Sequence, residues 1–310
     1  FEGGLEKSLL DGIISPAYHT FHSDVADSRF YYPYFRSHEF IKHKLVPHVY
    51  GIRDGRSIDI AGMKTIEIPY TSIEEQRKIG DYLESLDHLI TLHQRKCDEV
   101  KSLKKYMLQK MFPQNEQKVP EIRFEGFTEA WEQRKLSDIY DSIGNAFVGT
   151  ATPYYAEQGH FYLESNNVKD GQINHNSEIF INDEFYEKQK DKWLHTGDMV
   201  MVQSGHVGHA AVIPEELDNT AAHALIMFRN PKEEIEPYFL NYEYQTDKAK
   251  KKIENITTGN TIKHILASDM QEFVVDVPNY EEQKVIASYF RNIDHLITLH
   301  QRKPIPHPNH

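Results

Sequence analysis

The sequence contains one cysteine, Cys97, in 310 residues. A single cysteine excludes an internal disulfide framework and is typical of a reducing compartment, so a cytoplasmic location is expected. No apolar run approaches the roughly 20 residues that a membrane-spanning helix requires, and no signal peptide opens the chain. No membrane partner is therefore expected, and the 39% of hydrophobic residues are available for packed cores.

Positive charge is also scarce. There are 35 Lys and Arg residues against 47 Asp and Glu residues, which gives a formal net charge of −12. A protein that coats nucleic acid needs a basic surface, so this balance counts against that class. A binder that gathers its lysines and arginines on one face stays open as an interpretation.

Catalytic motifs are missing as well. The chain has no Gly-x-Ser-x-Gly elbow, no phosphate-binding Walker loop, no Gly-x-Gly-x-x-Gly turn and none of the motifs of adenine methyltransferases. His206 and His209 have the spacing of metal ligands, but a third ligand such as His223 would have to be brought in by folding. We therefore predict no metal site, no cofactor in this chain and no enzymatic activity of the chain alone.

The sequence does contain a long internal repeat. The decapeptide DHLITLHQRK occupies residues 87–96 and returns unchanged at 294–303, at an offset of 207. Glu-Glu-Gln at 74–76 returns at the same offset, at 281–283. A catalytic motif rarely needs an identical second copy, whereas a surface that must meet two identical partners does.

Farther upstream the register of the repeat shifts. The Tyr-Phe pair at 34–35 returns at 238–239, at an offset of 204. Residues 1–96 thus mirror about 205–303, which indicates one structural unit used twice. Residues 131–204 have no earlier counterpart, so we expect the first unit to lack its front part. An engineered boundary and a permuted arrangement stay open as alternatives.

The repeated segment has the pattern of a coiled coil. Ten positions from Ile79 to Met111 follow an unbroken 4-3 spacing, and eight of them hold an apolar residue or cysteine. Such a helix, from residue 74 to 111, would be roughly 57 Å long at about 1.5 Å per residue. We predict that two such helices pair antiparallel through this seam, which holds Ile79, Leu83, Leu86 and Ile90 in the first copy and Ile286, Phe290, Ile293 and Ile297 in the second.

Shorter signals outline the globular parts and the start of each helix. Ser72 with Glu75, and Asn279 with Glu282, have the spacing of a capping box. A further helix is expected over Pro237–Glu254, with the lysines between 248 and 252 in its last turn. Strands joined by glycine-containing turns are predicted at Asp198–Gln203, Ala210–Ile213, Ala224–Arg229 and Phe273–Val277.

The predicted fold class is α+β, with two mixed α/β domains separated by long antiparallel coiled-coil helices in a pseudo-twofold repeat. The expected segments are the C-terminal part of a first domain (1–70), a first spacer helix (71–112), a connector (113–130), a second domain (131–278), a shortened second spacer helix (279–303), and a tail or expression remnant (304–310).

Several motifs taken together resemble those of a known family. EIRFEGFT at 121–128, followed by WEQRKL at 131–136, resembles the opening of a second target-recognition domain. HTGDMV at 195–200, with the glycines at 205–208, resembles a central hairpin, and TTGNTIKHI at 257–265 resembles the loop before a final strand. With the repeated Glu-Glu-Gln and Asp-His-Leu-Ile segments, their order makes the chain similar to the specificity subunit of type I restriction-modification systems.

The resemblance implies a non-catalytic subunit that reads DNA. Two target-recognition domains would each read one half of a bipartite double-stranded target, and the helices would fix the spacing, as in dimeric readers. The helices would also dock two modification (methyltransferase) subunits, which would hold S-adenosylmethionine, and restriction subunits would join through the complex. The chain departs from this pattern because its first domain starts in its second half and its second helix stops at Lys303. A coiled-coil scaffold without sequence-specific DNA binding, which the acidic charge favours, is the alternative.

Candidate DNA contacts follow from the resemblance and from the chemistry of base and phosphate recognition. Gly259 would permit close backbone approach, Asn260 is suited to an adenine edge and Lys263 to a phosphate; an ordinary polar turn is the alternative. The full set in the second domain is Thr258, Gly259, Asn260, Thr261, Lys263, Asn166, Asn167, Lys169, Lys250 and Lys251, and in the first domain Arg53, Gly55, Arg56 and Ser57. The target bases and the spacer length are not encoded in any readable motif.

Overall fold

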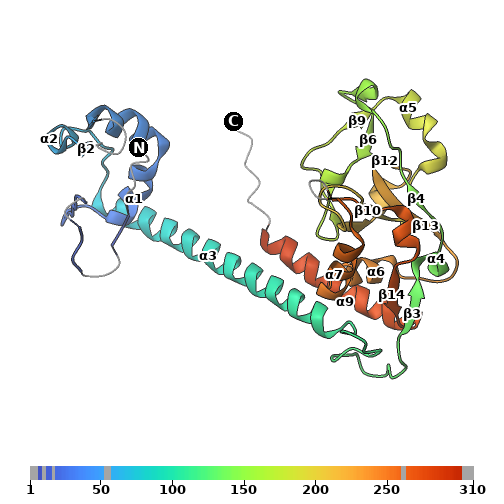
Figure 1. Ribbon diagram of the computed structural model, residues 1–310. Helices are drawn as coiled ribbons and strands as arrows, with labels where there is room; N and C mark the ends of the chain where they lie inside the picture. The colour runs from blue at the N-terminus through green and yellow to red at the C-terminus, as the bar shows by residue number, and fades with distance from the viewer. Residues whose placement is uncertain (1–5, 9–11, 16–17, 52–56, 260–262, 302–310) are drawn as a thin grey trace. The chain divides into compact units, whose positions relative to one another are not determined.

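The computed structural model describes residues 6–8, 12–15, 18–51, 57–259 and 263–301 (Figure 1). The chain divides into two compact units, unit 1 (Phe1–Lys96) and unit 2 (Cys97–His310). The boundary falls inside the long helix α3 (Ile73–Lys110), so α3 contributes to both units. No helix in these parts of the chain is both long and apolar enough to cross a membrane.

Unit 1 is mostly helical. Its elements before α3 are α1 (Ser28–Arg36), η1 (Phe40–Leu45), η2 (Val46–His48), β1 (Val49–Tyr50), β2 (Ser57–Ile58) and α2 (Ile60–Met63). Asp27 begins α1 as its N-cap, because its carboxylate accepts the backbone N–H of Arg29 at 2.8 Å. Aromatic side chains of α1 and η1 form the small core, in which the ring centroids of Phe35 and Phe40 lie 4.9 Å apart.

The long helix predicted from residue 74 to 111 is confirmed as α3. In unit 1 its predicted seam is only partly covered. Ile79 and Leu83 are half-buried, whereas Leu86 and Ile90 are 37% and 54% exposed. The antiparallel pairing predicted through these four residues therefore stays a prediction.

Both long helices begin at the predicted caps. The Ser72 hydroxyl accepts the backbone N–H of Glu75 at 3.3 Å, and the Asn279 side-chain oxygen accepts that of Glu282 at 3.0 Å. The Glu282 carboxylate is occupied by the Arg123 guanidinium, through two bonds of 2.7 Å. This paired arrangement ties the connector to the first turn of α9 (Tyr280–Gln301).

Unit 2 is built around an antiparallel sheet ordered β11-β10-β13-β4 (Figure 1). Its strands are β4 (Tyr140–Asn145), β10 (Met199–Val202), β11 (Ala210–Val212) and β13 (Leu225–Pro231). Every residue of β10 and β11 is buried, which is typical of strands covered on both faces. The four predicted strands are confirmed, the last of them as β14 (Val274–Val277).

Smaller elements complete unit 2. A second sheet is ordered β12-β6-β9-β5, and two further pairs join β14 to β3 and β7 to β8. These strands are β3 (Glu132–Lys135), β5 (Tyr155–Ala156), β6 (His160–Leu163), β7 (Val168–Lys169), β8 (Gln172–Ile173), β9 (Phe180–Ile181) and β12 (Ala221–Ala222). The short helices are α4 (Leu136–Ile139), η4 (Thr152–Tyr154), η5 (Ser165–Asn167), α5 (Asp183–Lys188), η6 (Lys190–Lys192), η7 (Glu215–Leu217) and α8 (Ala267–Gln271).

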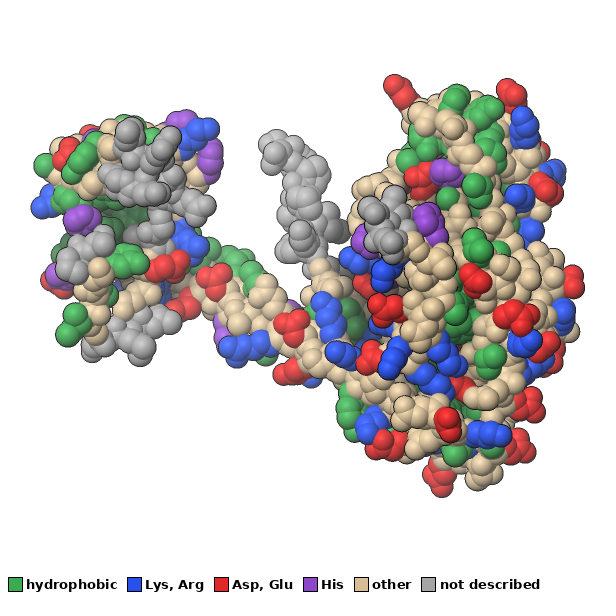
Figure 2. All heavy atoms as spheres, viewed as in Figure 1, with side chains coloured by type: hydrophobic (Ala, Val, Ile, Leu, Met, Phe, Trp, Pro, Cys, Tyr) green, Lys and Arg blue, Asp and Glu red, His purple; other side chains and the backbone are tan. Residues whose placement is uncertain are grey.

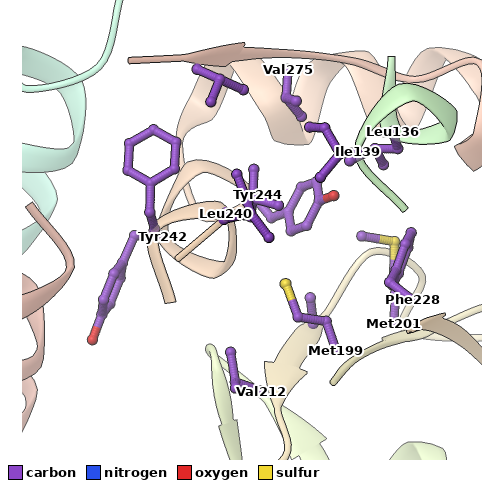
Figure 3. Packing of buried hydrophobic residues seen from close by; sticks show 14 of the residues in the cluster. Leu136, Ile139, Met199, Met201, Val212, Phe228, Leu240, Tyr242, Tyr244 and Val275 are labelled. Atoms are coloured by element: carbon purple, nitrogen blue, oxygen red, sulfur yellow. The ribbon is translucent and has the colours of Figure 1, made fainter. Parts of the chain in front are cut away.

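Strand β10 divides the hydrophobic core into two clusters. Met199 and Met201 lie in the cluster that includes residues of α4 and β14 (Figure 3), whereas Val200 and Val202 lie in a second cluster. Successive side chains of a strand point to opposite faces, so the two clusters cover opposite faces of the sheet. Burial of each such side chain contributes about 1.5–3 kcal/mol, which fixes the sheet from both sides.

The predicted seam of α9 is buried within unit 2. Its cluster joins α9 to the last turns of α3 and contains Ile286, Phe290, Ile293 and the half-buried Ile297 together with Val100, Leu108 and Met111. The Lys104 ammonium lies 2.7 Å from the Asp294 carboxylate at the same junction. Positions 100 and 111 of the predicted 4-3 spacing thus belong to the same core cluster as the residues of α9, and position 107 packs against that cluster.

The single helix predicted over Pro237–Glu254 is wrong. The segment forms α6 (Pro237–Glu243) and α7 (Asp247–Ile256), with a break between them. Thr246 makes the break, because its hydroxyl accepts the backbone N–H of Ala249 at 3.2 Å and caps a new helix. The lysines between 248 and 252 therefore lie within the first six residues of α7, and α7 has no basic residue in its last turn.

The internal repeat is visible in two equivalent glutamines. The amide nitrogens of Gln76 and Gln283 each donate to the carbonyl oxygen five residues earlier, at 2.8 and 2.9 Å. Their amide oxygens accept the backbone N–H of Asp27 and Glu236, both at 3.0 Å. Asp27 and Glu236 are the N-caps of α1 and α6, so each glutamine fastens the same kind of helix to the start of a long one.

The register of the repeat differs from the predicted one. Equivalent N-caps at Asp27 and Glu236 are 209 residues apart, so the offset of 204 taken from the aromatic pair at 34–35 is wrong by five residues. Ser37 and Thr246 fit the new offset, since each hydroxyl accepts the backbone N–H three residues later, at 3.1 and 3.2 Å. The first helix carries aromatic residues on most of its positions, so a Tyr-Phe pair can be matched in more than one register.

One equivalent contact differs in chemistry between the units. In unit 1 the Arg29 guanidinium donates to the Glu84 carboxylate at 3.2 Å. The offset of 209 takes Arg29 to Tyr238, and the offset of 207 takes Glu84 to Arg291 in unit 2. There the guanidinium carbon lies 4.5 Å from the centroid of the tyrosine ring, a cation–π contact in place of an ion pair.

Candidate nucleic-acid interface

A short hairpin in unit 2 presents the main group of predicted DNA contacts. The backbone N–H of Thr258 donates to the carbonyl of His264 at 2.9 Å, and that of His264 donates back at 2.8 Å. Asn260 and Thr261, at the predicted tip, lie outside the residues that the structure describes. Gly259 has a φ of +100°, a conformation that side chains with a Cβ rarely adopt, so glycine is required there.

This hairpin is held by the turn that follows β10. The backbone N–H of Gly205 donates to the carbonyl of Lys263 at 3.1 Å, and that of Ile265 donates to Gln203 at 3.0 Å. Two segments that the sequence suggested separately, 205–208 and 257–265, are therefore brought together. The Lys263 ammonium lies 3.4 Å from the Glu254 carboxylate; because both side chains are exposed, this pair contributes little.

The loop at 165–169 contains one structural residue and two exposed ones. Asn167 is buried, and its amide nitrogen donates to the carbonyls of Asn174 and Ser177, both at 3.1 Å. Its amide oxygen also accepts the backbone N–H of Glu164 at 3.0 Å. These bonds hold the loop in shape and bury the Asn167 side chain, which contradicts the prediction that Asn167 contacts a base. Asn166 and Lys169 are exposed, as a DNA contact requires.

The lysines of α7 divide into two pairs. The Lys248 ammonium lies 2.6 Å from the Asp276 carboxylate, and the Lys252 ammonium donates to a backbone carbonyl of β14 at 3.1 Å. Lys250 and Lys251 point to solvent. Lys250 and Lys251 are therefore the two lysines of this group that are open to a ligand, and their contact with DNA stays a prediction.

Residues 128–305 match the family model described as "Type I restriction modification DNA specificity domain". The chain belongs to this family.

Two curated specificity subunits from Methanocaldococcus jannaschii are related to the chain. The type I restriction enzyme MjaVIII specificity subunit is 23% identical over 254 residues, which cover 79% of this chain and 59% of the relative. The putative type I restriction enzyme MjaX specificity subunit is 24% identical over 252 residues, 80% of this chain and 57% of the relative. The chain thus spans less than two-thirds of the length of either relative.

A solved structure shares the fold. It is a chain from "Structural basis underlying complex assembly and conformational transition of the type I R-M system". The TM-score is 0.54 at 19% identity, and the match covers 89% of this chain and 65% of the other. The likeness supports an α+β target-recognition fold.

Within the specificity domain, residues far apart in the sequence converge on His209. Burial lowers the pKa of His209, Asp170 opposes this, and the positive charges of Lys250 and Lys169 lower the pKa further. The structure therefore brings together two candidate lysines that the sequence placed in separate loops. Within the described ranges, no three His, Cys, Asp or Glu side chains gather as they would around a metal ion.

Sequence reasoning missed two lysines that lie beside this group. Lys101 and Lys105 of α3 line the same groove as Lys250 and His209. They precede the matched residues 128–305 and belong to the helix rather than to a loop. Their spacing of four, which places both on one helix face, was a signal available in the sequence.

Most of the predicted DNA contacts of unit 1 lie outside the residues that the structure describes. Arg53, Gly55 and Arg56 are not among the described residues. Ser57 is half-buried and pairs with Tyr50 in the β1–β2 hairpin. This hairpin follows the α1–η1 segment as the Thr258–His264 hairpin follows α6 and α7 in the specificity domain.

Proposed function

We propose that this chain is the DNA-reading, non-catalytic subunit of a type I restriction-modification complex. The match of residues 128–305 to the family's DNA specificity domain carries the proposal. The hairpin at 258–264 and its supporting turn supply an exposed loop whose glycine geometry and lysine suit contact with DNA. The chemistry would belong to partner subunits, with S-adenosylmethionine bound by the methyltransferase. We expect the complex to act in the cytoplasm.

The internal repeat supports a bipartite target. Unit 1 and the second half of unit 2 share a glutamine-fastened helix, a hairpin, a short helix and a long helix in the same order. Two such units in one chain would place two reading loops at a fixed spacing, as two-headed DNA readers do. Each unit would read one half of the target.

The repeated helix also supports docking of two identical modification subunits. Leu89 and Leu92 in α3 are 49% and 53% exposed. The equivalent Leu296 and Leu299 in α9 are 45% and 46% exposed. The same apolar pair is therefore offered twice within an identical decapeptide, which suits two copies of one partner. Restriction subunits would join through that complex.

The proposed function is tested by a methylome. The chain would be produced with its cognate modification subunit in a host free of DNA methylation, and N6-methyladenine would be mapped across the genome. A split motif with a constant gap is expected. Motifs with only one specified half would contradict the two-headed reading. An assembled complex that leaves the genome unmethylated would support the scaffold alternative, which the family match does not favour.

A further inference from the structure

A groove in unit 2 runs between the last turns of α3 and the rest of the unit. Its volume is about 280 Å³. Lys101 and Lys105 of α3 form one wall, and His209 and Lys250 lie on the other side. This space is large enough for several water molecules, so a hydrated anion fits.

Three of the four described lysines that line the groove lack a carboxylate partner, whereas the fourth, Lys104, pairs with Asp294. Among the described residues, Lys101, Lys105, Lys250 and the adjacent Lys169 have no Asp or Glu oxygen within the 4.0 Å of a salt bridge. Elsewhere in unit 2 some exposed lysines are paired, as in the Lys135–Glu272 contact at 2.6 Å, whereas Lys118 and Lys188 have no carboxylate partner within the part of the chain that the structure describes. Asp170 and Asp247 also line the groove, so its lysines outnumber its carboxylates by four to two. With Lys169 beside it, the groove is a local excess of positive charge in a chain with a formal net charge of −12.

The spacing on α3 strengthens this view. Lys101 and Lys105 are four residues apart on one helix face, where like charges destabilise a helix. An anion between them would remove the repulsion. Figure 2 shows Lys and Arg side chains gathered over the last turns of α3 and the neighbouring part of unit 2, with Asp and Glu between them.

Fixed contacts hold the walls of the groove in place. The Lys104 ammonium lies 2.7 Å from the Asp294 carboxylate and 2.9 Å from the Gln245 amide oxygen, which fastens α3 to the domain. Across the groove, Gly171 has a φ of +84°, and a Cβ added there would lie 2.3 Å from the Gln245 amide nitrogen. The Asn241 amide donates to the Gly171 carbonyl at 2.8 Å. The groove is therefore preorganised rather than a gap between mobile side chains.

The groove also adjoins the hairpin formed by the pairing of Thr258 with His264, which we call the reading hairpin. Gly208 and His209 belong to the same turn whose Ser204 pairs with His264 of the hairpin. Lys250 lies on α7, which leads directly into residue 258. A strand of DNA whose bases meet the hairpin would continue past this turn toward the lysines.

We propose that this groove binds the phosphate backbone of duplex DNA and that the spacer helix thereby contributes to DNA affinity without contributing to sequence choice. The inference rests on the proposed function and adds a site to it. Lysine binds phosphate as a point charge and carries no base information. An acidic protein partner is less suited, because protein interfaces centre on apolar and aromatic anchors, whereas this lining is mostly charged and polar.

The test compares charge-matched variants of the full chain. Lys101→Gln with Lys105→Gln removes two groove charges, and Lys118→Gln with Lys188→Gln removes two exposed lysines elsewhere in unit 2. Binding to a labelled duplex of scrambled sequence would be measured by fluorescence anisotropy at several salt concentrations. The groove variant is expected to lose about tenfold in affinity near 100 mM salt and to lower the salt slope by about 2, since each phosphate contact contributes about 0.9. The control variant is expected to bind as the parent chain does.

Further measurements separate the possible failures. On a duplex carrying the target from the methylome, the groove variant should lose the same factor as on scrambled DNA, so the ratio of the two affinities stays unchanged. An unchanged affinity and slope would overturn the groove proposal, and so would intact DNA binding with loss of the modification subunit, which would make the groove a protein interface. A parent chain without any preference for the target would instead contradict the proposed function. Lys250→Gln, from a different element, should repeat the loss with a slope change of about 1.

Discussion

The side-chain Oε1 of Glu243 accepts a hydrogen bond of 2.8 Å from the backbone N–H of Asp276. Glu243 ends α6 and is buried, and Asp276 lies on β14 with its own carboxylate 2.6 Å from the Lys248 ammonium. Burial raises the pKa of Glu243 to about 8, because the loss of solvent outweighs the hydrogen bond and the nearby lysines. At neutral pH the side chain is therefore protonated in the folded protein.

Glu243→Gln is expected to remove a pH dependence of stability. The folded protein holds one more proton than the unfolded chain between about pH 4.5 and pH 8, so its free energy of unfolding falls as pH rises through this window. At pH 9 the variant should be more stable by roughly 1–4 kcal/mol, since one pKa unit corresponds to about 1.4 kcal/mol. Thermal unfolding at pH 6 and pH 9 measures this. Glu272→Gln, an exposed control, should leave the pH dependence as it is, and parallel curves for Glu243→Gln would refute the buried-proton account.

Gln283→Met is expected to destabilise unit 2. The substitution keeps a similar volume but leaves the Glu236 backbone N–H and the carbonyl five residues earlier without their partner. Loss of two bonds to buried groups should cost about 2–4 kcal/mol. Denaturant unfolding would measure it, with the exposed Gln172→Met as control. A loss below about 0.5 kcal/mol would show that these bonds contribute little to the fold.

The outer leucines of the repeat give a prediction about stoichiometry. Leu89→Glu with Leu92→Glu should remove one of two modification subunits, because the equivalent pair in α9 remains intact. Light scattering of the purified complex would show the mass fall by one subunit. Leu103→Glu is the matched control, since Leu103 is similarly exposed on α3 but lies outside the decapeptide. Retention of both subunits would move the docking surface elsewhere.

Asn260→Ala is expected to weaken binding to the target more than binding to scrambled DNA. In the sequence Asn260 follows Gly259, and an asparagine amide can pair with an adenine edge, a contact that discriminates between bases by about 1–3 kcal/mol. Competition binding with the two duplexes measures the difference. Asn255→Ala, exposed on α7, should change neither affinity. Equal losses of affinity on both duplexes would indicate that Asn260 contacts the DNA phosphate backbone rather than a base.

The sequence predicted the parts of the fold that depend on local pattern. The continuous apolar run of β10 and the 4-3 spacing of α3 are clear local patterns, and both elements were predicted with bounds shifted by one or two residues. The break at Thr246 was missed because its neighbours favour a helix; Thr246 is buried, so tertiary packing decides that its hydroxyl caps a new one.

The candidate site was predictable only in part. Lys169 and Lys250 were chosen because lysine in a loop or on a helix face suits phosphate. Their convergence with Lys101 depends on how α3 packs against the unit, which no local pattern contains. Asn167 was chosen because an amide side chain suits DNA contact, yet its three side-chain hydrogen bonds go to backbone groups of its own loop region. Residue type alone does not separate a polar side chain that shapes a loop from one that meets a ligand.

The exchange of Arg29–Glu84 for Tyr238–Arg291 bears on recombination between the two repeats. A crossover that joined the first helix of unit 1 to the long helix of unit 2 would set Arg29 against Arg291, with two guanidinium groups facing each other. The reciprocal product would set Tyr238 against Glu84, and the cation–π contact would be lost. Viable chimeras should therefore inherit each short helix together with its own long helix, so the heritable module is the pair and not the single helix.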